Sequence, residues 1–202
     1  LDTIARVIED PGAIEACLQL KARELEETVL TESRRLREVN NLLRQLKGES
    51  AMKYTVRIKE LPDVIGASMR TILPGYDTFF DIVPKMGDEM RRQGAVCREP
   101  AYCFTIYHDG EYKEQDIDVE VCEAVVKVCP DSEMVRYKTI PGVAQAACVL
   151  HKGSYSALRE AYAFLYRWIG DNGYRPAGPS RDSYIDGIWN KDSEEDWLTE
   201  IQ

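Results

Sequence analysis

The feature that most constrains the fold is an internal repeat in the C-terminal part of the chain. Pro141 lies 79 residues after Pro62, and further positions match at this interval without a gap. They are Arg57 and Arg136, Lys59 and Lys138, Val64 and Val143, Tyr76 and Tyr155, Met86 and Leu165, Met90 and Ile169, and Gly94 and Gly173. Because matched turn and glycine positions mark matched element ends, the repeat predicts two copies of one structural unit.

Each copy is predicted to fold as strand, strand, helix, strand, strand. The first copy has predicted strands at 54–60, 64–72, 102–108 and 117–126, and a helix at about 76–93 that ends at Gly94. The second copy has predicted strands at 134–140, 143–150, 181–185 and 196–202, and a helix at about 156–172 that ends at Gly173. Pro62-Asp63 and Asp109-Gly110 are turn signals between strands.

The predicted fold class is α+β. Two such units can pair edge to edge into one antiparallel sheet that carries both helices on one face. A groove would then remain between the helices, and a groove of this kind is a natural place for a ligand.

The N-terminal part follows a different pattern, because residues 15–47 contain no Gly or Pro and are rich in helix formers. Apolar residues recur there at heptad a and d positions, with Glu32 as the one interruption. The series is Leu18, Ala22, Leu25, Val29, Glu32, Leu36, Val39, Leu43 and Leu46. Charged residues flank the seam, and Gly48 ends the pattern. This indicates a coiled-coil helix that joins two chains as a homodimer.

The alternative for this segment is a single amphipathic helix packed on its own domain. A narrow a/d stripe favours the two-helix seam, because a helix on a globular core usually has a wider apolar face. Glu32 could set the register or pair with an Arg of the partner helix. A parallel and an antiparallel arrangement both remain open.

The charge of the chain bears on its partners. The net charge is −9, which argues against direct binding of nucleic acid by this chain, because phosphate binding depends mainly on Lys and Arg. The six cysteines form no CxxC pair and are expected to be reduced. Residues 1–10 lack the features of a signal peptide, and no stretch is apolar enough to span a bilayer. We therefore expect a cytoplasmic chain without membrane contact, and a fragment that lacks N-terminal material.

Few catalytic groups are available. The two histidines, His108 and His151, flank turns and have no carboxylate or Cys partner at a recognisable spacing. The chain contains no GxSxG, HExxH, Walker A or GxGxxG motif. We therefore expect no enzyme, no metal site and no cofactor.

The segment Arg181-Asp182-Ser183-Tyr184-Ile185-Asp186 is the best candidate for a binding site. In a strand, Asp182, Tyr184 and Asp186 share one face. A carboxylate buried there would be compensated by a ligand cation, to which aromatic walls add cation–π attraction. Possible walls are Tyr76, Phe79, Phe104, Tyr107, Tyr155, Tyr162, Trp168, Trp189 and Trp197. The alternatives are that these residues are ordinary core and that Asp182 forms a surface salt bridge with Arg181 or Arg175.

Four segments carry a resemblance to a known family: YTVRIKELP at 54–62, HKGSYSAL at 151–158, RDSYIDGIW at 181–189 and WLTEIQ at 197–202. They resemble the GyrI-like effector-binding domain, the sensor of multidrug-responsive MerR-family regulators of the BmrR type. The resemblance covers about residues 52–202. Residues 11–50 look like the dimerisation helix of those regulators, and residues 1–10 like the end of their DNA-binding domain.

The resemblance implies two pseudo-symmetric SHS2-type units around a pocket for hydrophobic, aromatic and often cationic compounds. The family's E-x-Y pattern reads Asp182-Ser183-Tyr184 here, one methylene shorter at the charged position. Trp197 stands where an aromatic wall is expected, and Tyr155 is a further wall. The full set of predicted ligand-binding residues is Asp182, Tyr184, Trp197, Tyr155, Tyr107, Phe79, Phe104, Tyr76 and Glu120.

The resulting hypothesis is a transcription activator whose effector domain senses drug-like molecules and transmits binding to DNA-binding heads. Promoter DNA would be contacted only through the missing N-terminal domain. Two other functions remain open. One is a small-molecule hydrolase that uses Glu120, Asp182 and Tyr184. The other is a protein-binding module similar to gyrase inhibitors.

Overall fold

The computed structural model describes residues 14–15, 17–25, 28–29, 31–32, 35, 39 and 54–202. They fall in two compact units, Leu1–Lys53 and Tyr54–Gln202. The described residues of the first unit are helical and include the continuous stretch 17–25. The predicted segment 1–10, the heptad positions Leu36, Leu43 and Leu46, and the end at Gly48 lie outside the described residues.

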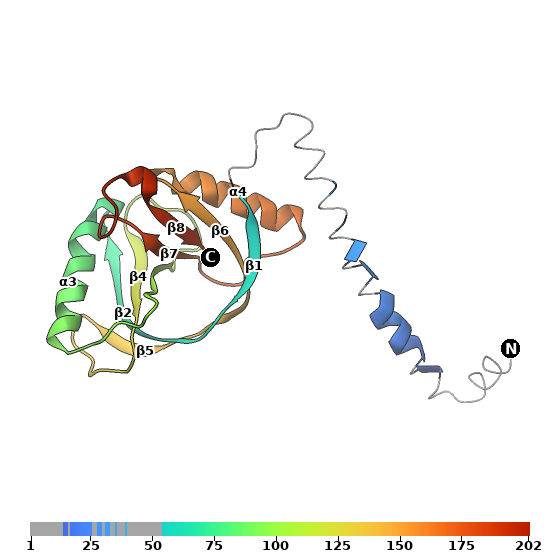
Figure 1. Cartoon of the computed structure of the whole chain (residues 1–202), viewed down its shortest axis with the longest axis horizontal. Coiled ribbons are helices and arrows are strands. Elements are labelled where there is room, and N and C mark those ends of the chain that lie inside the picture. The colour runs from blue at the N-terminus through green and yellow to red at the C-terminus, as the bar shows by residue number, and fades with distance from the viewer. Residues whose placement is uncertain are drawn as a thin grey trace. The chain divides into compact units, whose positions relative to one another are not determined.

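The second unit contains eight strands and two α-helices (Figure 1). The strands are β1 (Val56–Leu61), β2 (Val64–Leu73), β3 (Cys103–Tyr107), β4 (Ile117–Ala124), β5 (Arg136–Ile140), β6 (Val143–Lys152), β7 (Arg181–Asp186) and β8 (Leu198–Ile201). The helices are α3 (Phe79–Arg92) and α4 (Leu158–Asp171), and each follows a short 3-10 turn, Tyr76–Thr78 or Tyr155–Ala157. The predicted α+β class and element order are confirmed, and the duplication itself stays a prediction.

All eight strands form one antiparallel sheet in the order β1-β6-β8-β7-β3-β4-β2-β5. The sheet differs from the predicted pairing of two self-contained units. β1 does not pair with β2 across the Pro62-Asp63 turn but pairs with β6, while β2 pairs with β5. Each half of the domain therefore gives its first strand to the other half. The turn between β1 and β2 meets the turn between β5 and β6 at this strand exchange, since the Gly142 backbone N–H donates to the Asp63 carboxylate at 2.6 Å.

Both helices cover the same face of the sheet. Directly paired residues of an antiparallel sheet point to one face, and the pairing links Met69, Val121, Thr105, Asp182, Ile201 and Val149 into one row across six strands. Helix α3 packs on the Met69 end of this row, and α4 packs on the Val149 end. The middle of the row, over β3 and β7, lies between the helices.

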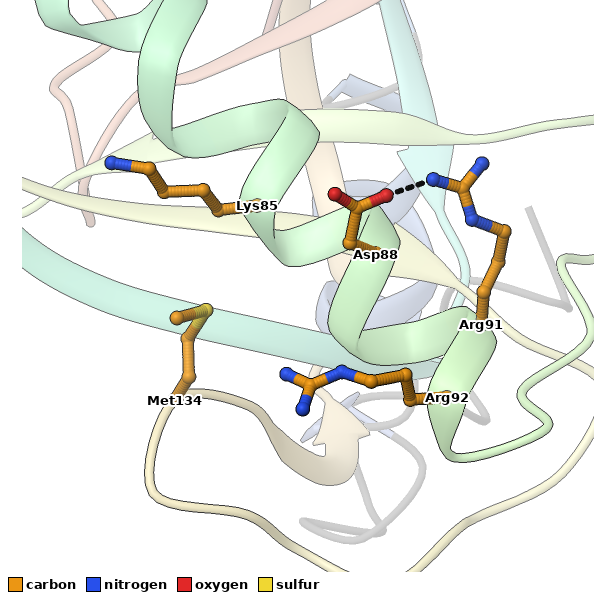
Figure 2. A pocket seen from close by; sticks show the side chains of 5 residues that line it. All are labelled: Lys85, Asp88, Arg91, Arg92 and Met134. Atoms are coloured by element: carbon orange, nitrogen blue, oxygen red, sulfur yellow. Dashed lines mark hydrogen bonds and ion pairs between the residues drawn. The ribbon is translucent and has the colours of Figure 1, made fainter.

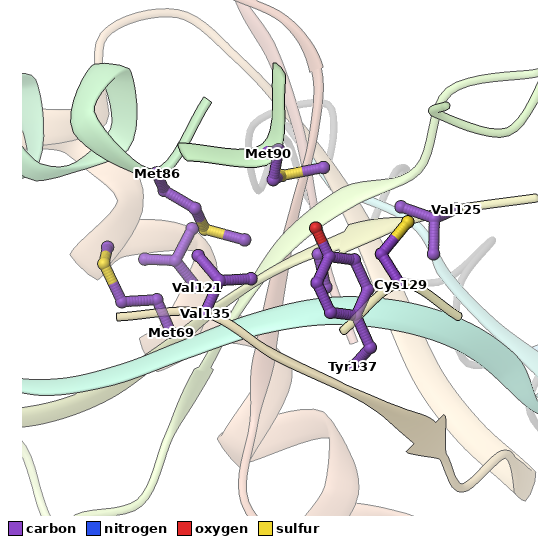
Figure 3. Packing of buried hydrophobic residues seen from close by; sticks show 9 residues of the cluster. Met69, Met86, Met90, Val121, Val125, Cys129, Val135 and Tyr137 are labelled. Atoms are coloured by element: carbon purple, nitrogen blue, oxygen red, sulfur yellow. The ribbon is translucent and has the colours of Figure 1, made fainter. Parts of the chain in front are cut away.

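The core under each helix follows from its sequence spacing. Met86 and Met90, four residues apart on α3, point into a buried cluster with Met69, Val121 and Tyr137 (Figure 3). Ala161 and Leu165 occupy the same spacing on α4 and pack against strands β6 and β8. No helix among the residues that the structure describes has the length and hydropathy needed to cross a membrane.

Candidate functional site

Six residues gather between the helices, and we call them the central cluster: Asp182, Tyr184, Tyr107, Tyr162, Tyr155 and Trp197. Their position follows from the register of β3 and β7, in which Thr105 pairs with Asp182 and Cys103 pairs with Tyr184. Helix α4 contributes Tyr162, whose hydroxyl donates to the Asp182 carboxylate at 2.7 Å. Side chains of the cluster thus occupy the interval that the sequence predicts as a groove.

Asp182 is the chemical centre of the cluster. It is 1% exposed, so the alternative of a surface salt bridge does not hold. Burial raises the pKa of its carboxyl group to about 6, while hydrogen bonds from Tyr162 and Tyr107 act in the opposite direction. No Lys, Arg or His within residues 54–202 contributes to this pKa. The site is therefore a buried carboxylate held by hydroxyl groups, without a counter-ion among the described residues.

Aromatic rings pack beside Tyr184 in the same cluster. The Tyr155 ring lies edge-on to Tyr184 at 5.6 Å and at 4.5 Å from Trp197, measured between centroids. The Tyr184 hydroxyl donates to Thr105 Oγ1 at 3.4 Å. Burial raises the pKa of Tyr155 to about 12, so its phenol is neutral at physiological pH. These rings form a wall that offers aromatic faces and edges.

A second aromatic group begins at the start of α3. Tyr76 stacks with Phe79 at 6.5 Å and with Tyr112 at 6.2 Å between centroids. Its hydroxyl donates to the Lys113 carbonyl at 3.0 Å. Burial raises the pKa of Tyr76 to about 12, and the charge of Asp182 adds to this rise. Tyr76 thus lies within electrostatic reach of Asp182 while remaining 38% exposed.

Of the predicted site residues, Tyr76 and Phe79 belong to this second group, and two others lie on the opposite face of the sheet. Phe104 and Glu120 each occupy the opposite parity on their strands, so their side chains point to the other face of the sheet. Phe104 is fully buried there, with Tyr102 stacked on it at 4.4 Å and the Arg181 guanidinium 5.4 Å from its ring centroid. Both residues were predicted from their residue types, without regard to the face of the strand on which they lie.

Glu120 is the centre of a separate ionic cluster on that other face. Ser68 Oγ donates to Glu120 Oε1 at 2.6 Å, Lys138 Nζ lies 2.5 Å from the same oxygen, and His108 Nε2 lies 3.0 Å from Oε2. Burial raises the pKa of Glu120, but the hydrogen bonds from Lys138, Ser68 and His108 outweigh it and lower the pKa below its usual range. This carboxylate is thus compensated by the chain itself, unlike Asp182.

Some polar residues near the central cluster were not predicted as site residues from the sequence. Thr199 pairs with Tyr184 and is fully buried, yet its Oγ1 has no hydrogen-bond partner in the described chain. The same holds for Nε1 of the buried Trp197. Glu123 pairs with Cys103 on the same face. Thr199 lies two residues after Trp197, so strand alternation from Trp197 would have indicated it, but only the strand order links Thr199 to Glu123.

Surface hollows lie apart from the cluster. One of about 750 Å³ is lined by the α3 side chains Lys85, Asp88, Arg91 and Arg92, together with Met134 (Figure 2). Asp88 and Arg91 form an ion pair there. None of the predicted site residues lines this hollow. Within the described residues, no three His, Cys, Asp or Glu side chains gather as metal ligands would.

Comparison with known proteins identifies the family. The model of the GyrI-like small molecule binding domain matches residues 54–202. The structure of EcmrR in its complex with DNA is 38% identical, with a TM-score of 0.82 over 99% of this chain and 74% of that chain. The EcmrR C-terminal domain is 44% identical, with a TM-score of 0.72 over 75% of this chain and 96% of that chain.

More distant structures share the fold alone. A hydrolase from Listeria innocua is 13% identical, with a TM-score of 0.50 over 78% of this chain and 95% of that chain. No curated protein gives a match. From the family match over residues 54–202 and the identity to EcmrR, a MerR-family regulator, the chain belongs to the GyrI-like small-molecule-binding family, and its domain corresponds to the effector-binding domain of such a regulator.

Proposed function

We propose that the central cluster binds hydrophobic organic cations as effectors of a MerR-type transcription regulator. The observation that carries this proposal is Asp182, a fully buried carboxylate without a cationic partner among the described residues. Burial of an uncompensated charge is unfavourable, and a ligand cation removes the penalty. Tyrosine and tryptophan faces around the charge add about 0.5–2 kcal/mol by cation–π attraction. Tyr76 and Tyr155 are only partly buried and would meet an entering ligand first.

Affinity for a panel of lipophilic cations tests this proposal. We expect Asp182→Asn to weaken the binding of cations about 10-fold, because the charge–charge attraction is lost. Neutral ligands of the same shape should bind equally to both proteins. Isothermal titration calorimetry measures these affinities. The matched control is Asp192→Asn, which removes the same charge from the exposed loop before β8. Equal cation affinity in Asp182→Asn and the unaltered chain would remove Asp182 from its proposed role.

The pH dependence gives the same test without a substitution. A cation binds the ionised carboxylate, whose pKa is about 6, so affinity should fall when the pH drops below that value. Between pH 7 and pH 5 we expect about a 10-fold loss for permanently charged cations.

We further propose that residues 15–47 form the dimer interface. In support, the seam positions Leu18, Leu25 and Val29 are 65%, 54% and 63% exposed in the single chain. Leu25→Glu places a charge in the seam, and we expect the dimer dissociation constant to rise at least about 10-fold. Analytical ultracentrifugation measures this constant, with Leu20→Glu as the control, because Leu20 lies outside the a, d, e and g positions of the heptad and is 61% exposed. An unchanged dimer dissociation constant in Leu25→Glu would contradict a dimer interface at the heptad positions.

Transmission to DNA is part of the same proposal. EcmrR has been solved in complex with DNA, and this chain matches 74% of that protein. Ligand binding at the central cluster would shift the placement of DNA-binding heads joined to the paired helices, and so activate transcription.

A duplication would explain where the site lies. In the pairing of β3 with β7, Cys103 meets Tyr184 and Thr105 meets Asp182. The repeat interval of 79 residues relates Cys103 to Asp182 and Thr105 to Tyr184. We infer that a pseudo-twofold axis passes between β3 and β7, so that the site lies where the two copies of the repeat meet.

The hydrolase alternative is less well supported. It requires Glu120 to act with Asp182 and Tyr184, whereas Glu120 lies on the opposite face of the sheet and is already paired with Lys138. The similarity to EcmrR, at 38% and 44% identity, also favours a binding role.

A further inference from the structure

A second carboxylate lies on the same face as Asp182 and has no counter-ion in the part of the chain that the structure describes. Glu123 is partly buried on β4, and burial raises the pKa of its carboxyl group. The Cys103 thiol, a weak donor, is its hydrogen-bond partner, and no Lys, Arg or His of the described residues contributes to its pKa. Glu123 is thus, like Asp182, a carboxylate without a cationic partner among the described residues. The carboxylate of Glu120, by contrast, is compensated by Lys138.

The sheet register places Glu123 in line with the central cluster. Cross-strand pairs join Glu123, Cys103, Tyr184 and Thr199 into one row, adjacent to the row that contains Asp182. Glu123 is two strands and two residues from Asp182, which sheet geometry converts to about 12 Å between their Cα atoms. An ionised Cys103 would raise the pKa of both Tyr155 and Tyr184, so these side chains lie close together and the aromatic wall begins at the Tyr184 position of this row.

Further evidence for a ligand comes from two unpaired polar atoms at the end of the row opposite to Glu123, where Thr199 closes the row and Trp197 lies two residues before it. Thr199 Oγ1 and Trp197 Nε1 are buried and have no partner within residues 54–202. Unsatisfied buried polar atoms are rare in native proteins, because each costs a desolvation penalty. Together with Glu123, they indicate that this row is incomplete without a bound molecule.

We propose that Glu123 forms a second cation subsite, so that the domain prefers elongated ligands with two positive charges. The inference rests on the proposed function, since it assigns the first charge of the ligand to Asp182. Tyr184 and Tyr155 would pack along the apolar spacer between the charges. A single-charged ligand would use Asp182 and leave Glu123 uncompensated.

The test compares linear bis(trimethylammonium) alkanes of increasing length with alkyltrimethylammonium ions of equal chain length, by calorimetry on the full chain. We expect an affinity maximum for spacers that span about 12 Å. There the bis-cation should bind about 10-fold more tightly than the single cation. Glu123→Gln should abolish this preference and leave the affinity for single cations within about 2-fold, because the two subsites are far apart. Glu133→Gln, in the exposed loop before β5, is the matched control.

The outcomes separate the two proposals. If single cations bind in dependence on Asp182 but no spacer length is preferred, the second subsite is refuted and the proposed function stands. If neither series binds, or if binding ignores Asp182, both proposals are refuted. The length dependence is measured on the unaltered chain, so it decides even if Glu123→Gln does not fold.

Discussion

Replacing Asp182 by Asn should raise the free energy of unfolding by about 2 kcal/mol at pH 7, while weakening the proposed cation binding. The pKa of Asp182 rises from 3.8 to about 6 in the folded chain. Since one pKa unit corresponds to about 1.4 kcal/mol, ionisation of the buried carboxylate costs about 3 kcal/mol. The Asn amide removes this charge, but it offers one acceptor oxygen where Tyr162 and Tyr107 now share two, which reduces the gain.

The sign of the pH dependence follows from the raised pKa. The folded state holds the proton of Asp182 more tightly than the unfolded state, so this group costs no stability below about pH 3.8. Its cost grows as the pH rises from 3.8 through about 6 and is constant above that. The difference between the two proteins should therefore be large at pH 7 and small at pH 4.

Urea denaturation at both pH values measures this difference. Asp192→Asn, which removes an exposed carboxylate, serves as the control and should leave stability nearly unchanged at both. A variant less stable than the unaltered chain at pH 7 would show that the carboxylate contributes more as a hydrogen-bond acceptor than it costs as a buried charge.

Gly142→Ala should lower the free energy of unfolding by about 3 kcal/mol or more. A Cβ atom at this position would lie 2.3 Å from the Leu61 carbonyl oxygen and 2.8 Å from the Asp63 backbone nitrogen. These are backbone atoms of the turn between β1 and β2, which cannot move away as a flexible side chain could. The substitution would force apart the two turns at which the halves of the domain exchange strands.

The matched control is Gly110→Ala, because a Cβ atom there meets nothing within 4 Å and the backbone of Gly110 is not left-handed. Its stability should change by less than about 0.5 kcal/mol. Urea denaturation of both variants decides the matter. Equal stability of Gly142→Ala and Gly110→Ala would mean that the contact between the turns is dispensable for the fold.

The predicted elements agree with the structure because each is encoded locally. The apolar spacing of Met86 and Met90 predicts α3, and Gly94 and Gly173, each with a positive φ, follow the ends of α3 and α4. The alternation in Asp182-Ser183-Tyr184 likewise predicts that Asp182 and Tyr184 share a face. Patterns of this kind depend only on the period of a helix or a strand, so the sequence contains them without knowledge of contacts.

Contacts between distant segments were decided by the tertiary structure alone. Phe104 and Glu120 have the residue types of a binding site, but the register of β4 with β3 turns both to the opposite face, where Glu120 meets Lys138. Asp182 lacks a counter-ion within residues 54–202, where no Lys, Arg or His contributes to its pKa. The same strand order brings Glu123 onto the face of Asp182. The physical reason is that a strand's own pattern separates its two faces, whereas its neighbours and its register determine which charges meet on each face.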